Sequence, residues 1–257
     1  MTPDGAFVDL AEKLADAAAP NLRRYFRATT TIETKADASP VTAADREAEA
    51  AMRAILEAEA PDHGIVGEEF GAQRGDAEYV WVLDPLDGTK SFITGKPTFG
   101  TLIGLARRGV PVLGVMDQPI LKERWIGVEG RATTFNGTPI ATRPCGALDR
   151  AWLSATSPGM FQGSDFAAFE RLRQMVWHTV YGSECLAYGL LAMGFIDLVV
   201  EADLKPYDFC ALVPVVTGAG GAMTDWRGRP LTLESDGRVV AAGDAGLLDA
   251  ALAALAG

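Results

Sequence analysis

Two aspartates three residues apart, Asp84 and Asp87, follow the apolar segment VWVL and begin the sequence DPLDGTK. An Asp-Gly pair after a strand is an ordinary turn signal, and a polar residue before a helix is an ordinary cap. Two carboxylates at this spacing can instead meet around one cation, with the carbonyl of Leu86 also directed inward. The sequence DPLDGTK is therefore either a simple turn or a metal-binding loop.

The residues behind the two aspartates could bind phosphate. The backbone amides of Gly88, Thr89 and Lys90, at the start of an expected helix, would offer donors and the positive end of the helix dipole to an anion. Two other acidic motifs do not fit. An EF-hand loop is excluded because its third position would be Leu86, and the haloacid-dehalogenase phosphatases have their aspartates two residues apart. One short loop could thus hold both a metal and a phosphate.

Further acidic residues lie in other segments. Glu68 and Glu69 follow the apolar segment GIV, and Asp208 lies in KPYDF at the start of an expected helix. Thr42 and Asp45 have the Thr-x-x-Asp spacing of a capping box before a helix. Taken singly, Glu68 and Glu69 are explained as a solvated loop pair and Asp208 as an N-cap. Thr42 and Asp45 are explained as the cap of their own helix. Their function depends on whether the fold brings them to DPLDGTK.

The elements that must position these residues follow from the hydrophobic pattern. Two helices are expected first, over 7–26 and 42–60, and Pro61 ends the second. Short apolar or alternating segments over 64–128 predict a mainly antiparallel sheet, and Asn136 with Gly137 predicts a tight turn.

Beyond about residue 145 the pattern alternates between helix and strand. The expected strands are AWLSAT, FIDLVVE and GRVVAAGD, and the expected helices are DFAAFERLRQMV, ECLAYGLLAMG, DFCALVPVVTGAGG and GLLDAALAALAG. Pro214 is expected to kink the third of these helices. The chain is therefore predicted to form two subdomains, residues 1–143 with the metal and phosphate loop and residues 144–257 with Asp208.

Composition narrows the possible functions. The 257 residues are 48% hydrophobic and have a net charge of -11, with no cluster of basic residues that could hold nucleic acid. The three cysteines have no CxxC spacing, which favours a reducing compartment. The amino-terminal segment does not have the pattern of a signal peptide, and no apolar run is long enough to span a membrane. We expect a cytoplasmic enzyme whose acidic surface suits cations.

Taken in order, four segments resemble the signature blocks of the inositol monophosphatase family of magnesium-dependent phosphatases. They are PVTAAD, GEE, WVLDPLDGTKSF, and PYD followed by GAGG, and they extend over nearly the whole chain. Within the family, FITGKPTFGTLIGL, VLGVMDQPILKERWIG, YGSECLAYGLLAMG and DLKPYDFCALVPVVTGAGGAMTDW are most similar to the branch that dephosphorylates L-histidinol phosphate in histidine biosynthesis.

The resemblance implies an α/β fold, a layered αβαβα sandwich, usually homodimeric, with two to three Mg²⁺ ions per subunit. Carried onto this sequence, the first metal would be held by Glu68, Asp84 and the carbonyl of Leu86. The second would be held by Asp84, Asp87 and Asp208. A third, weaker site would lie near Glu68.

The resemblance also implies a mechanism. A metal-activated water would attack phosphorus in line, while a second cation neutralises the departing alkoxide. Thr89, hydrogen-bonded to Asp45, would orient that water and help to remove its proton. The amides at Gly88 and Thr89, with Lys90 beside them, would hold the phosphate. Lys35 could close over the site, although it also reads as an ordinary solvated lysine.

Substrate contacts are implied at Asp87, Glu184 and Glu201. Histidinol carries an ammonium group, to which two glutamates could make charge-assisted bonds that neutral inositol does not need. The chain departs from the histidinol-phosphatase pattern at Glu184, where aspartate is expected. Two alternative readings of these glutamates are a residue that favours a helix start and a ligand for any hydroxyl group.

Three other functions stay open at this point. Inositol monophosphate is the nearest alternative substrate, and a nucleotide 3'-phosphate is a further one that the negative charge disfavours. A non-catalytic regulator that binds metal or a phosphometabolite is the alternative from another class. The presence of Thr89 beside the acidic residues argues against it, because a binding protein does not need a residue that positions water.

Overall fold

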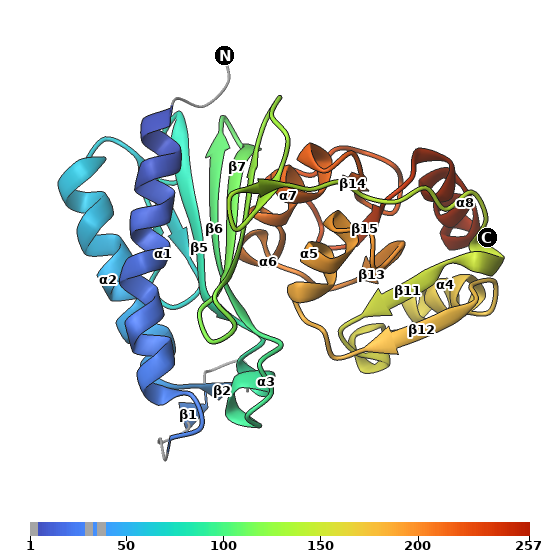
Figure 1. Ribbon diagram of the computed structural model, residues 1–257, viewed down its shortest axis with the longest axis horizontal. Helices are drawn as coiled ribbons and strands as arrows, with labels where there is room; N and C mark the ends of the chain where they lie inside the picture. Colours follow the sequence, from blue (N-terminus) through green and yellow to red (C-terminus); the bar gives the residue numbers. More distant parts are fainter. Residues whose placement is uncertain (1–4, 29–32, 35–39) are drawn as a thin grey trace.

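The computed structural model describes residues 5–28, 33–34 and 40–257, so Lys35 lies outside the described residues. Helices and sheets alternate in layers across the long axis of the molecule (Figure 1). Two helices cover the outer face of a first sheet, three shorter helices lie between this sheet and a second one, and two helices cover the far side. This order of layers confirms the α/β, αβαβα sandwich expected from the sequence.

The first sheet has eight strands in the order β10-β9-β8-β7-β6-β5-β3-β4. Every pairing is antiparallel except that of β3 with β5. Asn136 and Gly137 both have positive φ and connect β9 to β10, which confirms the expected tight turn. The strands are β3 (Gly64–Gly67), β4 (Gly71–Gln73), β5 (Tyr79–Asp87), β6 (Gly100–Arg107), β7 (Val110–Gln118), β8 (Glu123–Val128), β9 (Thr134–Phe135) and β10 (Thr138–Pro139).

Helices α1 (Gly5–Tyr25) and α2 (Ala43–Glu59) pack together on one face of this sheet. Their apolar sides, with Leu14 and Met52 fully buried, meet Trp81 and Ile103 from the sheet. Thr42 caps α2 as the sequence predicted. Its hydroxyl accepts the Ala44 amide, and the Asp45 carboxylate accepts the Thr42 amide. A two-stranded ribbon of β1 (Glu33–Thr34) and β2 (Pro40–Val41) precedes α2.

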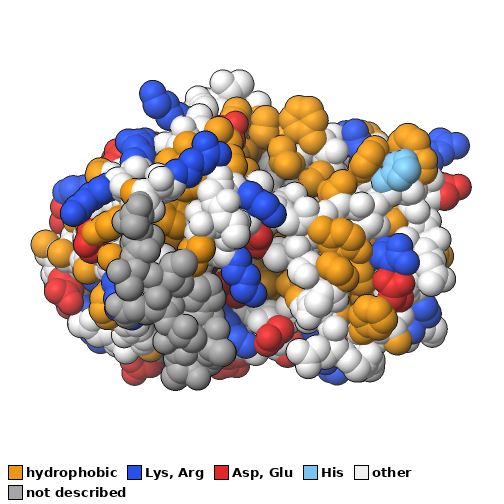
Figure 2. Space-filling view, turned by 90° about the horizontal axis from the view of Figure 1, so that it is seen from below, with side chains coloured by type: hydrophobic (Ala, Val, Ile, Leu, Met, Phe, Trp, Pro, Cys, Tyr) orange, Lys and Arg blue, Asp and Glu red, His pale blue; other side chains and the backbone are white. Residues whose placement is uncertain are grey.

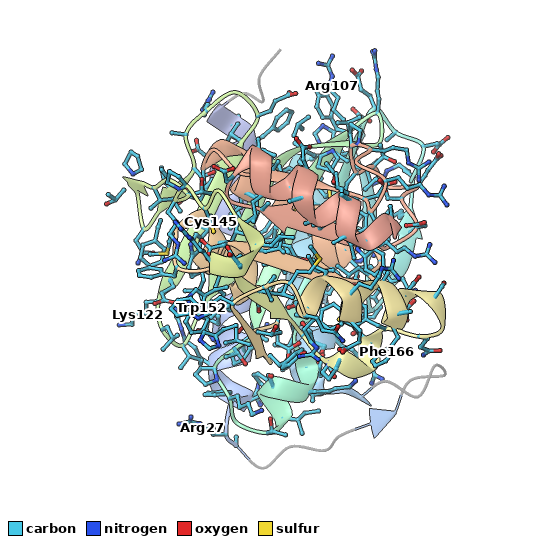
Figure 3. The ribbon with its side chains drawn as sticks, turned by 90° about the vertical axis from the view of Figure 1, so that its right-hand side faces the viewer. Arg27, Arg107, Lys122, Cys145, Trp152 and Phe166 are labelled. Carbon is cyan, nitrogen blue, oxygen red and sulfur yellow. The ribbon has the colours of Figure 1, made fainter. Side chains whose placement is uncertain are left out.

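The second sheet has five strands in the order β12-β11-β13-β15-β14. Strand β11 runs parallel to β12 and β13, while β15 is antiparallel to β13 and β14. Helices α4 and α8 cover its outer face and lie in front of it in Figure 3. The elements are β11 (Trp152–Ala155), β12 (His178–Tyr181), β13 (Leu198–Glu201), β14 (Ala222–Thr224), β15 (Val239–Ala242), α4 (Ser164–Arg173), α8 (Ala245–Ala256) and the 3-10 turns Leu148–Arg150 and Pro158–Met160.

Three helices fill the space between the sheets: α5 (Leu186–Ala192), α6 (Pro206–Phe209) and α7 (Leu212–Gly218). The core around them contains Met116 and Trp125 from the first sheet as well as Val199 and Val239 from the second. One hydrophobic core therefore continues across residue 143. The division into subdomains 1–143 and 144–257 stays a prediction.

The single helix predicted over DFCALVPVVTGAGG is wrong. The segment forms two helices, because α6 ends at Phe209 and α7 begins at Leu212. Pro214 explains the interruption, since a proline ring collides with the carbonyl of the residue four positions earlier, here Cys210. Inside α7, Pro214 is the third residue, where its missing N–H has no helical acceptor to lose.

Three glycines make room for this interrupted segment. Gly104, Gly114 and Gly127 are direct neighbours on β6, β7 and β8. A Cβ atom on Gly114 would lie 1.8 Å from the carbonyl oxygen of Ala211, and one on Gly127 would lie 2.3 Å from that of Pro214. The backbone between α6 and α7 therefore lies directly on the backbone of the first sheet. This contact fixes the distance between the first sheet and α6, the helix that carries Asp208.

Candidate active site

Asp84 and Asp87 lie at the carboxyl end of β5, where the strand is irregular. Residues three apart on a regular strand point to opposite faces. The register between β5 and β6 shifts between Asp84 and Asp87, so that both carboxylates can turn to one side. Thr101 holds the irregular segment by donating its hydroxyl to the Pro85 carbonyl at 2.9 Å. This irregularity allows two aspartates three residues apart to point to the same side of the strand.

Asp208 completes a compact group with these two aspartates. One carboxylate oxygen from each of Asp84, Asp87 and Asp208 lies within 4.8 Å of the others. Asp208 is the third residue of α6, and its carboxylate accepts the Lys205 amide at 2.6 Å. The reading of Asp208 as an N-cap is wrong, since the N-cap is Lys205. The structure thus brings together the three aspartates that the family resemblance gave to one metal.

The protonation of this group reflects burial and repulsion. Burial raises the pKa of Asp84 well above its ordinary value, and the neighbouring carboxylates of Glu68 and Asp87 raise it further. The pKa of Asp87 is raised to about 7 by burial and by Glu184, although the amide of Cys185 donates to it at 2.8 Å. Burial and Asp87 likewise raise the pKa of Asp208. Close carboxylates out of water are costly unless a cation accompanies them.

Glu68 lies beside the aspartates but outside their closest group. It follows β3, its amide donates to the Leu83 carbonyl at 3.1 Å, and its side chain shares a hydrogen bond with Asp84. The carboxylates therefore form one acidic cluster, Glu68 with the three aspartates. Such oxygen ligands are those that Mg²⁺ prefers, so the donor set fits a divalent cation.

Thr89 connects the cluster to α2. Its hydroxyl lies 3.3 Å from Oδ1 of Asp45 and 3.1 Å from the carbonyl oxygen of Leu86. The other oxygen of Asp45, Oδ2, accepts both the amide and the hydroxyl of Thr42. Asp45 is therefore held in one orientation with Oδ1 toward Thr89. Burial raises the pKa of Asp45, and its bonds to Thr42 lower it.

A cavity of about 460 Å³ opens beside Thr89. Residues from both halves of the chain line it, and Lys/Arg side chains lie close to Asp/Glu side chains where the two halves of the molecule meet in Figure 2. Gly88, with φ of 85°, caps the short helix α3 (Thr89–Ile93), whose first amides have no acceptor within the helix. The lining residues are Glu68, Gly88, Thr89, Lys90, Ser91, Thr94, Lys96, Thr156, Ser157, Gly182 and Glu184.

Glu184 reaches this cavity from the segment between β12 and α5. Its backbone has a positive φ of 50°, and its carboxylate accepts the Ser91 hydroxyl at 2.9 Å. A Cβ atom on Gly88 would lie 2.9 Å from Cγ of Glu184, so only glycine leaves room for this side chain. Burial raises the pKa of Glu184, while Ser91 and Thr156 lower it by hydrogen bonding.

Glu201 lies deeper, at the end of β13. Only 4% of its surface is exposed, and its carboxylate accepts the Thr156 amide at 3.0 Å and the Tyr188 hydroxyl at 2.8 Å. Burial raises the pKa of Glu201, and Glu184 adds to the rise. The charge of Glu201 raises the pKa of Asp87, but Glu201 does not line the cavity. Its direct contact with a substrate stays a prediction.

Sequence reasoning missed Ser91, Lys96 and Thr156. Thr156 follows β11 and contacts both Glu184 and Glu201. Its place as the polar last residue of the expected strand AWLSAT was an available signal, because carboxyl ends of parallel strands share one edge of a sheet. Ser91 and Lys96 had no comparable signal, since their role depends on a partner far along the chain.

An αβαβα sandwich with an acidic cluster and a cavity where strands of both sheets end is the architecture of a layered phosphatase. The model of the "Inositol monophosphatase family" matches residues 6–256. The chain therefore belongs to this family of phosphatases. The family seen in the sequence is therefore confirmed.

Proteins named for different functions are similar to this chain. The chain is 52% identical to the "Bifunctional phosphatase IMPL2, chloroplastic" of Arabidopsis thaliana, over 97% of this chain and 75% of the relative. It is 36% identical to the histidinol-phosphatase of Mycobacterium tuberculosis, over 85% of this chain and 87% of the relative. A solved inositol monophosphatase from Zymomonas mobilis superimposes with a TM-score of 0.91 at 53% identity, covering 99% of this chain and 100% of the other.

Among residues 5–28, 33–34 and 40–257, no helix is both long and apolar enough to cross a membrane.

Proposed function

We propose that the protein hydrolyses L-histidinol phosphate to L-histidinol and phosphate, as a magnesium-dependent phosphomonoesterase of histidine biosynthesis. The observation that carries this proposal is the placement of Glu184 on the same cavity as Thr89 and Glu68. A carboxylate that can bind an amine then lines the same cavity as groups that can bind a phosphate. Three relatives named histidinol-phosphatase, at 32–36% identity, support the same substrate.

The metal would be held by the acidic cluster. Glu68, Asp84 and the carbonyl of Leu86 would form one site, and Asp84, Asp87 and Asp208 the other, for two to three Mg²⁺ per subunit. The compact placement of the three aspartates supports the second set. When bound, magnesium would stabilise the charge on the phosphoryl group and acidify the attacking water.

Thr89 and Asp45 would guide the attacking water. The Thr89 hydroxyl has one proton, which it can donate to Oδ1 of Asp45, leaving its oxygen to accept a hydrogen bond from that water. Asp45 is fixed by Thr42 and has a raised pKa, so it is suited to receive a proton through Thr89. No covalent phosphoenzyme is required.

The phosphate would lie against the start of α3. The amides of Gly88 and Thr89 would donate to its oxygens, and Lys90 would add positive charge. Lys90 and Lys96 both line the cavity and both lower the pKa of Glu184, so their positive charges support binding of an anion in this cavity.

The amino-alcohol part of the substrate would be bound by Glu184, with Glu201 and Asp87 behind it. A carboxylate bonded to an ammonium group gives a charge-assisted hydrogen bond, stronger than one to a neutral hydroxyl. Glu201 would act mainly by fixing Thr156 and Tyr188, since both of its oxygens already accept hydrogen bonds.

We further propose that the protein is cytoplasmic and homodimeric.

Inositol 1-phosphate is a second candidate substrate. It is favoured by the Zymomonas mobilis inositol monophosphatase, which shares 53% of its sequence with this chain. The relative from Arabidopsis thaliana is described as bifunctional, so one such chain can carry two activities.

The test compares esters side by side. Phosphate release in Mg²⁺ is measured for L-histidinol phosphate, myo-inositol 1-phosphate, fructose 1,6-bisphosphate and adenosine 3',5'-bisphosphate. A clear kcat/KM preference for L-histidinol phosphate is expected. A preference for inositol phosphate, or an even profile, would overturn the substrate but keep the phosphatase chemistry. Release of phosphate from none of the esters would contradict the phosphatase proposal and favour a non-catalytic regulator.

A further inference from the structure

Helix α2 carries a second buried carboxylate, Glu49, one turn after Asp45. The side chain of Glu49 is completely buried. A carboxylate in such a position is costly unless several donors satisfy it. Neither the metal ligands nor the substrate contacts proposed above include Glu49, and its placement requires another explanation.

The donors to Glu49 come from the turn that follows Glu68. The amide of Glu69 donates to Oε2 of Glu49 at 2.7 Å, and the amide of Phe70 donates to Oε1 at 3.2 Å. Arg53, one turn further along α2, donates to Oε1 at 2.7 Å and also to the carbonyl of Gly71. The turn between β3 and β4 is therefore tied to α2 by two successive amides and one carbonyl.

Gly67 is shaped to admit this carboxylate. A Cβ atom at Gly67 would lie 2.0 Å from Oε1 of Glu49, an overlap that neither atom could tolerate. The amide of the next residue, Glu68, donates to the Leu83 carbonyl of β5. The backbone at Glu68 is thus held between β5 and Glu49, and its side chain is directed to Asp84, with which it shares a hydrogen bond.

We propose that Glu49 is a positioning residue that aims Glu68 at the metal. This inference rests on the proposed role of Glu68 as a metal ligand, and it assigns Glu49 no contact with substrate or metal. Groups that orient metal ligands through hydrogen bonds typically change metal affinity by about 10–100-fold when they are removed. The candidate active site then depends on α2 twice, through Asp45 toward Thr89 and through Glu49 toward Glu68.

Binding of Mn²⁺ alone tests the proposal, because it needs neither substrate nor turnover. Calorimetry on Glu49→Gln is expected to give a dissociation constant about tenfold higher than that of the unchanged protein. Glu49→Asp keeps the charge and should recover part of the affinity. The control, Glu57→Gln, removes one negative charge from the exposed side of the same helix and should leave the affinity within twofold of the unchanged protein.

Gly67→Ala provides a second, independent change. In the unchanged protein it should push the Glu49 carboxylate away and weaken Mn²⁺ binding. In a Glu49→Ala background there is no carboxylate to displace, so Gly67→Ala should cause little further loss. The positioning role is contradicted if Glu49→Gln lowers the stability of the metal-free protein but leaves its Mn²⁺ affinity unchanged. It is also contradicted if Gly67→Ala weakens Mn²⁺ binding by the same factor with and without Glu49→Ala.

The outcome is separable from that of the proposed function. If no phosphate ester is hydrolysed, weaker Mn²⁺ binding by Glu49→Gln still confirms that Glu49 positions a metal ligand. If Glu49→Gln does not fold, the comparison of Glu49→Asp with Glu57→Gln decides the question by the same measurement. Equal Mn²⁺ affinities for those two variants would overturn the inference.

Discussion

The hydroxyl of Thr89 lies 3.3 Å from Oδ1 of Asp45, although the two residues are 44 positions apart in the sequence. Asp45 keeps this orientation because its other oxygen is held by the amide and hydroxyl of Thr42. A helix-capping arrangement therefore also sets a proton acceptor beside a hydroxyl in the candidate active site. The same residues serve helix stability and, in the proposed mechanism, water activation.

Replacing Thr89 separates these two roles. Thr89→Val removes the hydroxyl with little change of shape, so we expect kcat to fall by about 10²–10⁴-fold. Binding of Mn²⁺ should change by no more than a few fold, since Thr89 is not a proposed metal ligand through its side chain. Thr89→Ser keeps the hydroxyl and should retain most activity. A Thr89→Val enzyme with normal kcat would contradict the proposed role of the hydroxyl.

The outcome at Asp45 and Thr89 shows what the sequence could reveal. The capping box was readable because its partners are three residues apart, and the acidic residues of DPLDGTK were readable as one motif. The convergence of Asp84 and Asp87 depends on a shift in register with β6, which no local pattern encodes. The pairing of Glu49 with Arg53 is local, but its contacts with the amides of Glu69 and Phe70 had no signal, because these amides lie twenty or more residues away.

The fold was readable to a similar extent. The two helices, the antiparallel meander and most later elements follow from hydrophobic spacing. Strand β12 was missed because its four residues, HTVY, are not an apolar run, and strand β14 was missed because it has only three residues. The division of the predicted helix after Asp208 could have been inferred from Pro214. The matching of Gly104, Gly114 and Gly127 across three strands could not, because it requires the register of the sheet.

The glycine contact predicts a specific sensitivity. Gly114→Ala would place a methyl group 1.8 Å from the carbonyl oxygen of Ala211, so we expect the free energy of unfolding to fall by about 1–3 kcal/mol or more. Displacement of α6 should also move Asp208 and weaken Mn²⁺ binding. Gly146→Ala has open space around it and should change stability by less than about 0.5 kcal/mol. Chemical denaturation compares the two, and equal stabilities would argue against close backbone contact.

The raised pKa of Asp87 predicts how the metal-free protein responds to pH. In the folded chain this pKa is about 7, compared with an ordinary value of 3.8, chiefly because of burial and then of Glu184. The folded state therefore binds the proton more tightly than the unfolded state does. The stabilising contribution is complete below about pH 4 and is lost as the pH rises through about 7.

Denaturation in a chelator between pH 5 and 8 measures this effect. We expect the free energy of unfolding to fall with rising pH, less steeply in Asp87→Asn, and Mg²⁺ to reverse the loss in the unchanged protein. Asp87→Asn should fold but have no measurable turnover. Stability that increases with pH in the chelator, or an Asp87→Asn protein that keeps most of its activity, would show that Asp87 does not play this part.

Glu184 should determine which alcohol is accepted. Loss of a hydrogen bond to a charged group costs about 1.5–3 kcal/mol. We expect Glu184→Gln to reduce kcat/KM for L-histidinol phosphate by roughly 10–100-fold and to affect myo-inositol 1-phosphate much less. Glu234→Gln, at an exposed carboxylate outside the lining of the cavity, should leave both values unchanged. An equal loss for both substrates would assign Glu184 a structural role, for instance in holding Ser91.

Removal of the metal is the most direct test of the central claim, that the acidic cluster supports phosphate ester hydrolysis. Phosphate release from L-histidinol phosphate is followed in Mg²⁺, after addition of a chelator in excess, and after Mg²⁺ is restored. We predict that release stops in the chelator and returns with Mg²⁺. Release that continues unchanged in the chelator, or that is absent throughout, would contradict the account.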